Sequence, residues 1–573
     1  MKRAAVIIGV DKTGTLPKLR DAVKSAKRVA EWARAQEMDS VELLTDETSP
    51  VTVSAVKEKI RAIVNSNSYD QLLVFFAGHG VNRQRSEYWL LSGAPTDTQE
   101  AVNLAGSKAL AMTCGIPHVI FISDACRTAA EGIQAQSVTG SEIFPNLEGN
   151  EGAVDEFFAC GLGRPSHEVR DPNVTAAEFS ALYTSELLTA LEGKQAQVIE
   201  WEANDATVGH VHLRPLRDHL AVAIQERLKT LELQTRVIQV PVAIIASDPP
   251  AWLSEVKSRP SRLGFGPRRR GAWDRQGVEP APEATPSLDD RLTAVQQGAT
   301  SAPDALSGRT DFVDSAIRLA SPFGPMSHET ETGFKIRGAK IVEAYSPRAD
   351  TQVSEFGGDV RVETDMSNCI LLRLDSGDGV LLPAVRGFIT ALTIDEGELV
   401  DVAYEPSDNS WRWSEYQRRA GEIRALRAIA ATSLTDGVFH LDRLDAPTIA
   451  RRMQYAKGID PSLAVYAGYA YHDLRRRDLL IEMARYLTRD LGAPLFDVAL
   501  LSRALDNRLV SDAQVLSPFP LLAQGWALLN AYRVKLAPEL DGLADRLKPS
   551  VWTLLDSDGV QQVGAAIATG VIR

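Results

Sequence analysis

The sequence contains few cysteines, no long apolar run and no excess of basic residues. Its four cysteines (114, 126, 160 and 369) show no Cys-x-x-Cys spacing, which argues against a zinc site or a disulfide framework and favours a reducing compartment. No apolar run approaches the ~18 residues that a membrane-spanning helix needs. The net charge of −13 excludes a broad basic face for nucleic acid. We therefore expect a cytoplasmic protein that binds neither membranes nor nucleic acid and needs no cofactor.

Two short apolar runs are distinctive because each ends at a potentially reactive side chain. Residues 72–77 precede Gly78-His79-Gly80, and residues 119–122 precede Ser123-Asp124-Ala125-Cys126. Uninterrupted apolar runs of this length are typical of strands buried on both faces of a parallel sheet. In such sheets the chemistry lies beyond the carboxyl ends of the strands. The sequence therefore predicts that His79 and Cys126, 47 positions apart, meet at the ends of two strands of one sheet.

A cysteine and a histidine in this arrangement are suited to nucleophilic catalysis. A thiol near its free pKa is only a few per cent thiolate at neutral pH, and a neighbouring imidazole makes it an effective nucleophile. The glycines on both sides of His79 keep side chains away from the loop. Each residue alone has an ordinary structural explanation, because a buried cysteine is usually a small hydrophobe. Their joint occurrence at strand ends favours the catalytic interpretation.

These motifs resemble those of the caspase-like cysteine proteases, namely caspases, paracaspases and metacaspases. Ala77-Gly78-His79-Gly80 resembles the small-Gly-His-Gly element of the family, and Asp124-Ala125-Cys126-Arg127 resembles its nucleophile element. Caspases have Gln two residues before the cysteine, whereas this chain has Asp124, as in metacaspases and paracaspases. The resemblance covers roughly residues 1–250. It implies a cysteine endopeptidase with a His79–Cys126 dyad.

The resemblance also implies a role for each residue at the site. Cys126 would attack the scissile carbonyl, and His79 would act as base or, as in this family, mainly as acid toward the leaving amine. The backbone N–H groups of Gly80 and Cys126 are the expected oxyanion donors. Asp124 resembles the acidic specificity pocket of metacaspases, and Asp11, just after the first strand, is a second candidate pocket acid. For each of these two carboxylates, the alternative to a role in the substrate pocket is a structural role in capping a loop. We expect cleavage after Arg, with Lys as a second option.

Alternating strand and helix patterns predict the fold of the first 250 residues. They indicate an α/β class, with a mostly parallel sheet sandwiched by helices. The expected strands are 4–9, 41–44, 71–77, 118–123, 154–160 and 236–245, and the expected helices are 16–37, 53–64, 104–112 and 179–191. His210 and His212 alternate on a further strand but lack a third ligand, so we expect no metal site.

The rest of the chain predicts a linker and two smaller domains. Residues 251–325 are rich in Pro, Ser, Ala and Arg without periodicity, which indicates a flexible linker. Residues 326–413 alternate apolar and polar positions between glycine turns, which indicates a β-rich, antiparallel domain. Residues 414–573 predict an α-helical domain that is regulatory or binds a partner. Its helices are expected at 415–432, 446–455, 461–472, 475–490, 494–505 and 518–534.

The distribution of basic residues leads to a hypothesis about activation. Residues 128–153, the intersubunit loop of the resembled family, contain no Lys or Arg, whereas the linker contains Arg268-Arg269-Arg270. A solvated charge cluster is the simpler interpretation of that run. Because flexible segments are the preferred sites of proteolysis, we expect a latent zymogen activated by cleavage at residues 257–275, by itself or by an upstream protease. The alternative is a regulatory protein that activates the intact chain by shifting a conformational equilibrium.

Two other functions fit the same residues. One is a catalytically inactive caspase-like scaffold or adaptor that acts through its C-terminal modules. The other is a different Cys–His hydrolase or acyl transferase built on a similar sheet. The intact His79–Cys126 pair favours a protease, whose partners would be protein substrates.

Overall fold

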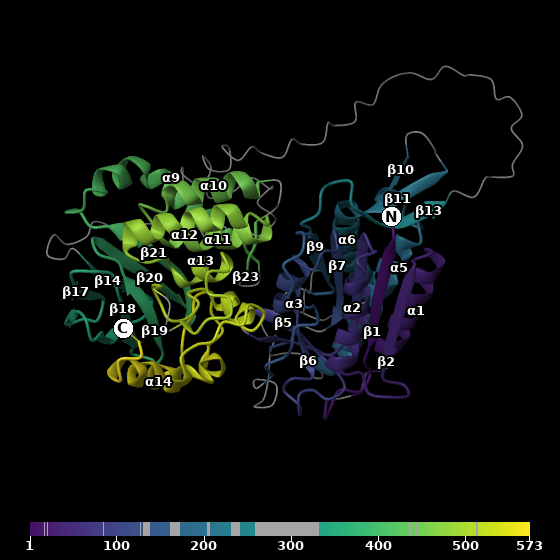
Figure 1. Cartoon of the computed structure of the whole chain (residues 1–573), viewed down its shortest axis with the longest axis horizontal. Helices are drawn as coiled ribbons and strands as arrows, with labels where there is room; N and C mark the ends of the chain where they lie inside the picture. The colour runs from purple at the N-terminus through teal and green to yellow at the C-terminus, as the bar shows by residue number, and fades with distance from the viewer. Residues whose placement is uncertain are drawn as a thin grey trace, which may run out of the picture.

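The computed structural model describes most of the chain outside the linker. The described residues are 1–16, 18–19, 21–83, 85–125, 128–129, 138–160, 172–202, 207–230, 241–257, 332–435, 438–441, 445–510 and 514–572. They form two lobes that lie side by side (Figure 1), one drawn in purple to teal and the other in green to yellow. We call them the N-terminal lobe, residues 1–257, and the C-terminal lobe, residues 332–572.

A six-stranded sheet in the order β12-β9-β7-β3-β1-β2 is the centre of the N-terminal lobe. Its strands are β1 (Arg3–Gly9), β2 (Ser40–Thr45), β3 (Gln71–Gly78), β7 (His118–Ala125), β9 (Ala153–Phe158) and β12 (Val242–Ile244). All neighbouring pairs are parallel except β12 and β9. The predicted α/β class and the predicted sheet are confirmed.

Helices cover both faces of this sheet, as Figure 1 shows. They are α1 (Ala22–Ala35), α2 (Val53–Ser66), α3 (Leu104–Ala111), α5 (Pro172–Leu191) and α6 (Leu213–Thr230). Successive side chains of a strand point to opposite faces. Accordingly, Val6 and Ile8 pack with α2 and α3, whereas Ala5 and Ile7 pack with α1, α5 and α6. Burial on both faces is the physical reason for the uninterrupted apolar runs in these strands.

Two small sheets extend the N-terminal lobe, and the sequence analysis missed one of them. The missed sheet is β6-β5-β4-β8, with β4 (Gly80–Arg83), β5 (Ser86–Leu90), β6 (Ala101–Asn103) and β8 (Thr128–Ala129). The other sheet is β10-β11-β13, with β10 (Ile199–Trp201), β11 (Val208–His212) and β13 (Trp252–Lys257). Strand β13 lies inside the segment that we assigned to the linker. It pairs with β11, and Leu253 is fully buried, so the N-terminal lobe extends to Lys257.

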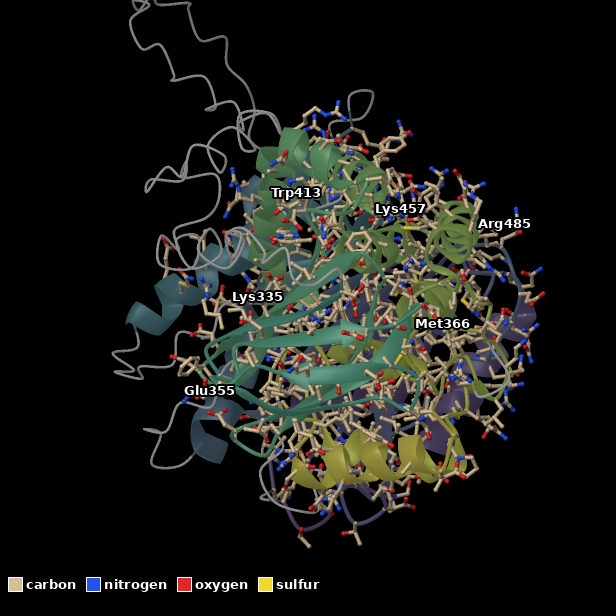
Figure 2. All side chains as sticks on the ribbon, turned by 90° about the vertical axis from the view of Figure 1, so that its left-hand side faces the viewer. Lys335, Glu355, Met366, Trp413, Lys457 and Arg485 are labelled. Carbon is tan, nitrogen blue, oxygen red and sulfur yellow. The ribbon has the colours of Figure 1, made fainter. Side chains whose placement is uncertain are left out.

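Two sheets build the first half of the C-terminal lobe, in the orders β16-β17-β14-β20-β21 and β15-β18-β19. The strands are β14 (Gly333–Arg337), β15 (Ile341–Tyr345), β16 (Asp350–Val353), β17 (Asp359–Glu363), β18 (Asn368–Leu374), β19 (Gly379–Ala384), β20 (Phe388–Asp395) and β21 (Glu398–Pro406). The expected antiparallel pairing holds except between β14 and β20, which are parallel. Figure 2 looks onto these strands, with α9 above them and α14 below.

The second half of the C-terminal lobe is mainly helical. Its α-helices are α9 (Trp413–Thr432), α10 (Ala446–Ala456), α11 (Ser462–Asp473), α12 (Arg477–Leu491), α13 (Phe496–Leu501) and α14 (Ser557–Ala568). The helix predicted at 494–505 is shorter, and the one predicted at 518–534 is wrong. That segment contains only a 3-10 helix, η4 (Ala523–Leu528). Pro518 and Pro520 explain the error, because proline lacks the N–H that a helix interior requires.

The β-rich and helical segments form one body. Arg427 of α9 is buried and forms ion pairs with Glu405 of β21, at 3.2 Å, and with Asp460, at 2.7 Å. Asp460 also accepts a hydrogen bond from the backbone N–H of Tyr404 in β21. One apolar cluster runs through both segments and continues to the α2 and α3 side of the N-terminal lobe. The two separate C-terminal domains that the sequence suggested therefore share a core.

Candidate active site

Strand register brings Gly78 and Ala125, the residues that precede His79 and Cys126, to one edge of the central sheet. Strands β3 and β7 are parallel neighbours, and Gly78 pairs with Ala125. Beyond the site, β4 and β8 are also parallel, and Val81 pairs with Thr128. Both pairings have the same 47-residue offset that separates His79 from Cys126. Cys126 itself lies outside the described residues, so the dyad stays a prediction, bracketed on both sides by paired backbone.

His79 lies in a narrow turn between β3 and β4. Its side chain is largely buried, and its carbonyl oxygen accepts a hydrogen bond from the N–H of Leu90, at 2.9 Å. The preceding Gly78 has no room for a side chain, because a Cβ there would lie 2.6 Å from the ring of Phe76. The following Gly80 begins β4 and pairs with Trp89. The two glycines therefore let the chain pass from the central sheet into the hairpin with His79 at the turn.

Asp124 lies fully buried near the carboxyl end of β7, one residue before Ala125. The hydroxyl of Thr184 in α5 donates a hydrogen bond to its carboxylate. Burial raises the pKa of Tyr183, the neighbour of Thr184, well above its usual value, and the charges of Asp124 and Cys160 add to this effect. Asp124 is thus a carboxylate held beneath the sheet edge that carries His79. Its assignment to the substrate pocket stays a prediction.

Asp11 follows β1 at the same edge of the sheet. Its carboxylate accepts a hydrogen bond from the N–H of Val23, at 3.1 Å, in the first turn of α1. Burial raises the pKa of Asp11 against the opposing effect of this hydrogen bond, and the nearby charge of Asp46 adds to the rise. This contact is the capping role that the sequence analysis gave as the alternative. The pocket role of Asp11 also stays a prediction.

A buried polar cluster below the site was missed by the sequence analysis. The indole N–H of Trp89 donates to Glu87, at 2.7 Å, and to Ser123, at 2.9 Å. The hydroxyl of Ser123 donates to the same carboxylate of Glu87. These residues connect β5 to β7 just before Asp124. The signal that could have revealed the cluster is a glutamate beside the apolar residues Tyr88 to Leu91.

The C-terminal lobe holds the hairpin that follows His79. Arg83, at the end of β4, donates hydrogen bonds to the carbonyl of Val138 and to the carboxylate of Asp545. Arg85, at the hairpin turn, donates through Nε to the carbonyl of Ser550, at 3.1 Å, and forms an ion pair with Glu398, at 2.9 Å. We call these contacts of Arg83 and Arg85 the hairpin clamp.

Other predicted site residues lie elsewhere. His210 and His212 are on β11, where His210 is 3.8 Å from Glu202 and His212 is 3.4 Å from Glu200. Among the residues that the structure describes, no group of three or more His, Cys, Asp or Glu side chains could hold a metal ion. The expected processing residues Arg268, Arg269 and Arg270 lie outside the described residues. Within the described ranges, no helix has the length and apolar character needed to cross a bilayer.

The fold and the candidate site define an α/β protein in which His79 follows β3 and Ala125 ends the adjacent parallel strand β7. The family model described as caspase domain matches residues 2–219 of this chain. The predicted resemblance is thereby confirmed. A caspase domain supports the activity of a cysteine protease, which is a hydrolase.

Comparison with known proteins found structural matches of low similarity. A crystal structure of a protein from Geobacter sulfurreducens is 15% identical, with a TM-score of 0.30 and coverage of 45% of this chain and 98% of that chain. The Drosophila initiator caspase Dronc is 10% identical, with a TM-score of 0.27 and coverage of 44% and 82%. No curated protein sequence matches the chain.

Proposed function

We propose that this protein is a cysteine endopeptidase that uses a His79–Cys126 dyad to cleave proteins after Arg, with Lys as a second option. The observation that carries the proposal is the common 47-residue offset of the pairs Gly78–Ala125 and Val81–Thr128. Because the two strand pairings before and after these positions have the same offset, we expect residues 79 and 126 to lie close to each other. His79 and Cys126 would therefore face one substrate from adjacent strand ends, as nucleophilic catalysis requires.

In the proposed mechanism the thiolate of Cys126 attacks the carbonyl carbon of the scissile peptide bond. The backbone N–H groups of Gly80 and Cys126 stabilise the negative charge that develops on the carbonyl oxygen. His79 transfers a proton to the leaving amine, and the acyl group remains on the sulfur. Water then hydrolyses the thioester and regenerates the thiol.

Asp124 supports the proposed preference for Arg. A buried carboxylate discriminates between substrate side chains more strongly than a hydrophobic pocket does. Only Arg can form a bidentate, charge-assisted contact with it, and any other side chain loses that contact. Asp124 is fully buried and lies two residues before Cys126. Asp11 is a weaker candidate, because its carboxylate already caps α1.

The hairpin clamp supports latency. Arg83 and Arg85 lie four and six residues after His79, and both are held by the C-terminal lobe. A clamp on this hairpin would bias the position of His79 and of the loops around it. Latency in this scheme is a conformational equilibrium that the C-terminal lobe shifts toward an inactive arrangement.

A thiol-reactive peptide probe that ends in Arg tests the proposed activity. We expect intact-mass analysis to show one probe per chain in the wild type and none in Cys126→Ala. Cys114→Ala is the matched control, because that thiol is buried and precedes β7 in the chain, and this variant should be labelled like the wild type. A wild type that resists labelling even after proteolysis of the linker would instead indicate the inactive scaffold.

A further inference from the structure

A cleft of about 240 Å³ lies between the two lobes, away from the candidate active site. One wall comes from the end of α3 and residues 147–151 of the N-terminal lobe. The other wall comes from the segment between α11 and α12 and from the end of α13. Cavities that hold drug-sized ligands span about 300–1,000 Å³, so this cleft fits a ligand of metabolite size.

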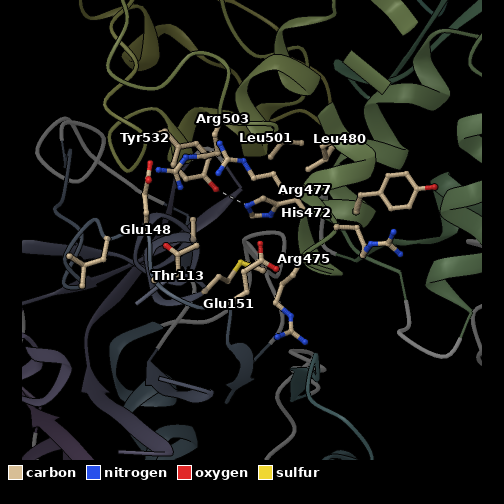
Figure 3. Close-up of a pocket in the computed structure, with 16 residues that line it drawn as sticks. Thr113, Glu148, Glu151, His472, Arg475, Arg477, Leu480, Leu501, Arg503 and Tyr532 are labelled. Carbon is tan, nitrogen blue, oxygen red and sulfur yellow. Dashed lines mark hydrogen bonds between the residues drawn. The ribbon is translucent and has the colours of Figure 1, made fainter. Parts of the chain in front are cut away.

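Four arginines line the wall formed by the C-terminal lobe. Arg475, Arg476 and Arg477 are consecutive, and Arg503 lies beside them. Figure 3 shows the Arg477 and Arg503 side chains converging near Tyr532. Two guanidinium groups on one wall create a concentrated positive charge, which is the arrangement that planar carboxylates and phosphates recognise.

The four arginines differ in how their charges are compensated. Arg476 is exposed and pairs with Asp478 through two nitrogens, at 2.6 and 2.9 Å. Arg503 forms an ion pair with Asp506, and its guanidinium stacks 4.2 Å from the centre of the Tyr532 ring. Arg477 donates through Nε to the carbonyl of Ser502, at 3.3 Å, and this acceptor carries no net charge that would neutralise the guanidinium.

Arg477 is therefore the arginine that remains for a ligand beside the Arg503 guanidinium, whereas the Arg475 side chain points away from both. Among the described residues Arg477 forms no ion pair with an acidic side chain, although its charge acts on the nearby Asp506 together with that of Arg503. Helix α12 begins at Arg477, and the carboxylate of Asp478 in its first turn offsets part of the positive potential at that end.

The remaining lining is apolar, aromatic or acidic. Leu480, Leu501 and Met112 supply apolar contacts. The Nε2 atom of His472 and the hydroxyl of Tyr532 form a hydrogen bond at 2.7 Å. Glu148 and Glu151 lie on the wall of the N-terminal lobe and would accept hydrogen bonds from donors on a ligand. A ligand that satisfies all of these groups has an anionic head and a flat, largely apolar body with hydrogen-bond donors.

We propose that this cleft binds a small organic anion with a flat, largely apolar body, whose charged head is held by Arg477 and Arg503. Because the two walls come from different lobes, a bound ligand would contact both and favour their packed arrangement. This would make the cleft a regulatory site distinct from the site at His79. The proposal concerns binding and does not depend on peptidase activity.

Phenyl phosphate is a suitable probe, because it combines a dianionic head with a flat ring. Its binding to the full-length chain can be measured by ligand-observed NMR titration, with inorganic phosphate and phenol as the two half-probes. We expect saturable binding of phenyl phosphate and at least tenfold weaker binding of each half-probe. Hydrogen-exchange protection should increase in both walls, in residues 147–151 and 471–477. Failure of phenyl phosphate to saturate, or protection confined to other segments, would overturn the proposal.

Substitution of the cleft arginines provides the matched comparison. Arg477→Gln and Arg503→Gln should each weaken phenyl phosphate binding about tenfold or more, because each removes a charge-assisted hydrogen bond. Arg477→Lys should retain part of the affinity, because the charge remains but the fork geometry is lost. The Arg476→Gln variant should bind like the wild type, because the guanidinium that it removes is paired with Asp478. Equal affinity for all four variants would contradict the proposal, provided that each variant unfolds at the temperature of the wild type.

Discussion

Arg85 and Glu398 are 313 positions apart in the chain, yet their side chains form an ion pair at 2.9 Å. Arg85 is in the hairpin turn that follows His79, and Glu398 begins β21 of the C-terminal lobe. The two side chains are mostly buried, so solvent screens their attraction less than at the surface. This contact directly links the candidate active-site hairpin to the C-terminal lobe.

The first prediction concerns the hairpin clamp. Glu398→Gln should raise the basal kcat/KM for an Arg-ended peptide about fivefold, because losing about 1 kcal/mol from the clamp shifts the equilibrium toward the active state. Glu343→Gln is the control, since it breaks a 2.9 Å pair with the exposed Arg373 on a strand that does not reach the hairpin. Unchanged activity in both Glu398→Gln and Asp545→Asn would rule out the clamp as the cause of latency.

The second prediction concerns the dyad. His79→Ala and Cys126→Ala should each lower kcat/KM for peptide cleavage at least about 10³-fold, because the two members of a nucleophile–base unit act together. The temperature of unfolding should change little in Cys126→Ala. The assignment is wrong if both variants keep more than a few per cent of the activity.

The third prediction separates the charge of Asp124 from its hydrogen bond. Asp124→Asn should lower kcat/KM for Arg-ended peptides about 10²-fold, because the guanidinium loses its charged partner. Thr184→Val removes only the hydroxyl that donates to Asp124 and should cause a change of a few fold. The comparison uses fluorogenic peptides that end in Arg, Lys or Asp. Faster turnover of the Asp-ended peptide by the wild type would refute the proposed specificity.

The fourth prediction concerns the pH dependence of stability. Burial lowers the pKa of His472 to about 4; the charge of Asp473 opposes this effect, and the charges of Lys108 and Arg503 add to it. The folded state therefore keeps His472 neutral while the unfolded chain, with a pKa near 6.5, binds a proton. The free energy of unfolding should fall by up to about 1.4 kcal/mol per pH unit as the pH decreases from 6.5 to 4.

Denaturant unfolding between pH 4 and 7.5 measures this slope. His472→Gln should flatten it in that window, because the titrating group is gone. Tyr532→Phe is the matched control: it removes the hydroxyl bonded to His472 but keeps the imidazole, so it should lower stability and retain the slope. An identical slope in His472→Gln and the wild type would show that another group causes the pH dependence.

The fifth prediction concerns the linker. Replacing Arg268, Arg269 and Arg270 with Ala should block cleavage at residues 257–275 and keep the enzyme latent. A cut there removes only the tether, so the lobes can separate on dilution, because an intramolecular contact becomes a bimolecular one. Mass spectrometry and peptide turnover are measured on the same triggered sample. A triple variant that stays intact yet reaches full activity would favour activation by a regulatory partner.

The sequence by itself determined the class of the N-terminal lobe and predicted which of its residues are reactive. Strands buried on both faces must be continuously apolar, so residues 72–77 and 119–122 were recognisable without tertiary information. The His79 and Cys126 motifs follow those runs directly and are local in the chain. Local patterns also predicted helices α9 to α12; α10 and α12 combine apolar and polar positions at helical spacing, whereas α11 is buried over almost its whole length.

Only the tertiary structure decided how the two lobes meet. The hairpin clamp joins Arg83 to Asp545 and Arg85 to Glu398, and the arginines of the cleft face glutamates hundreds of positions away. No local pattern encodes such pairs, because each of these charged residues, considered alone, looks like an ordinary solvent-exposed surface residue. The sequence also could not show that β13 belongs to the N-terminal lobe, since its six residues acquire a partner only when β11 is folded beside them. Long-range pairing, rather than residue type, gives these segments their roles.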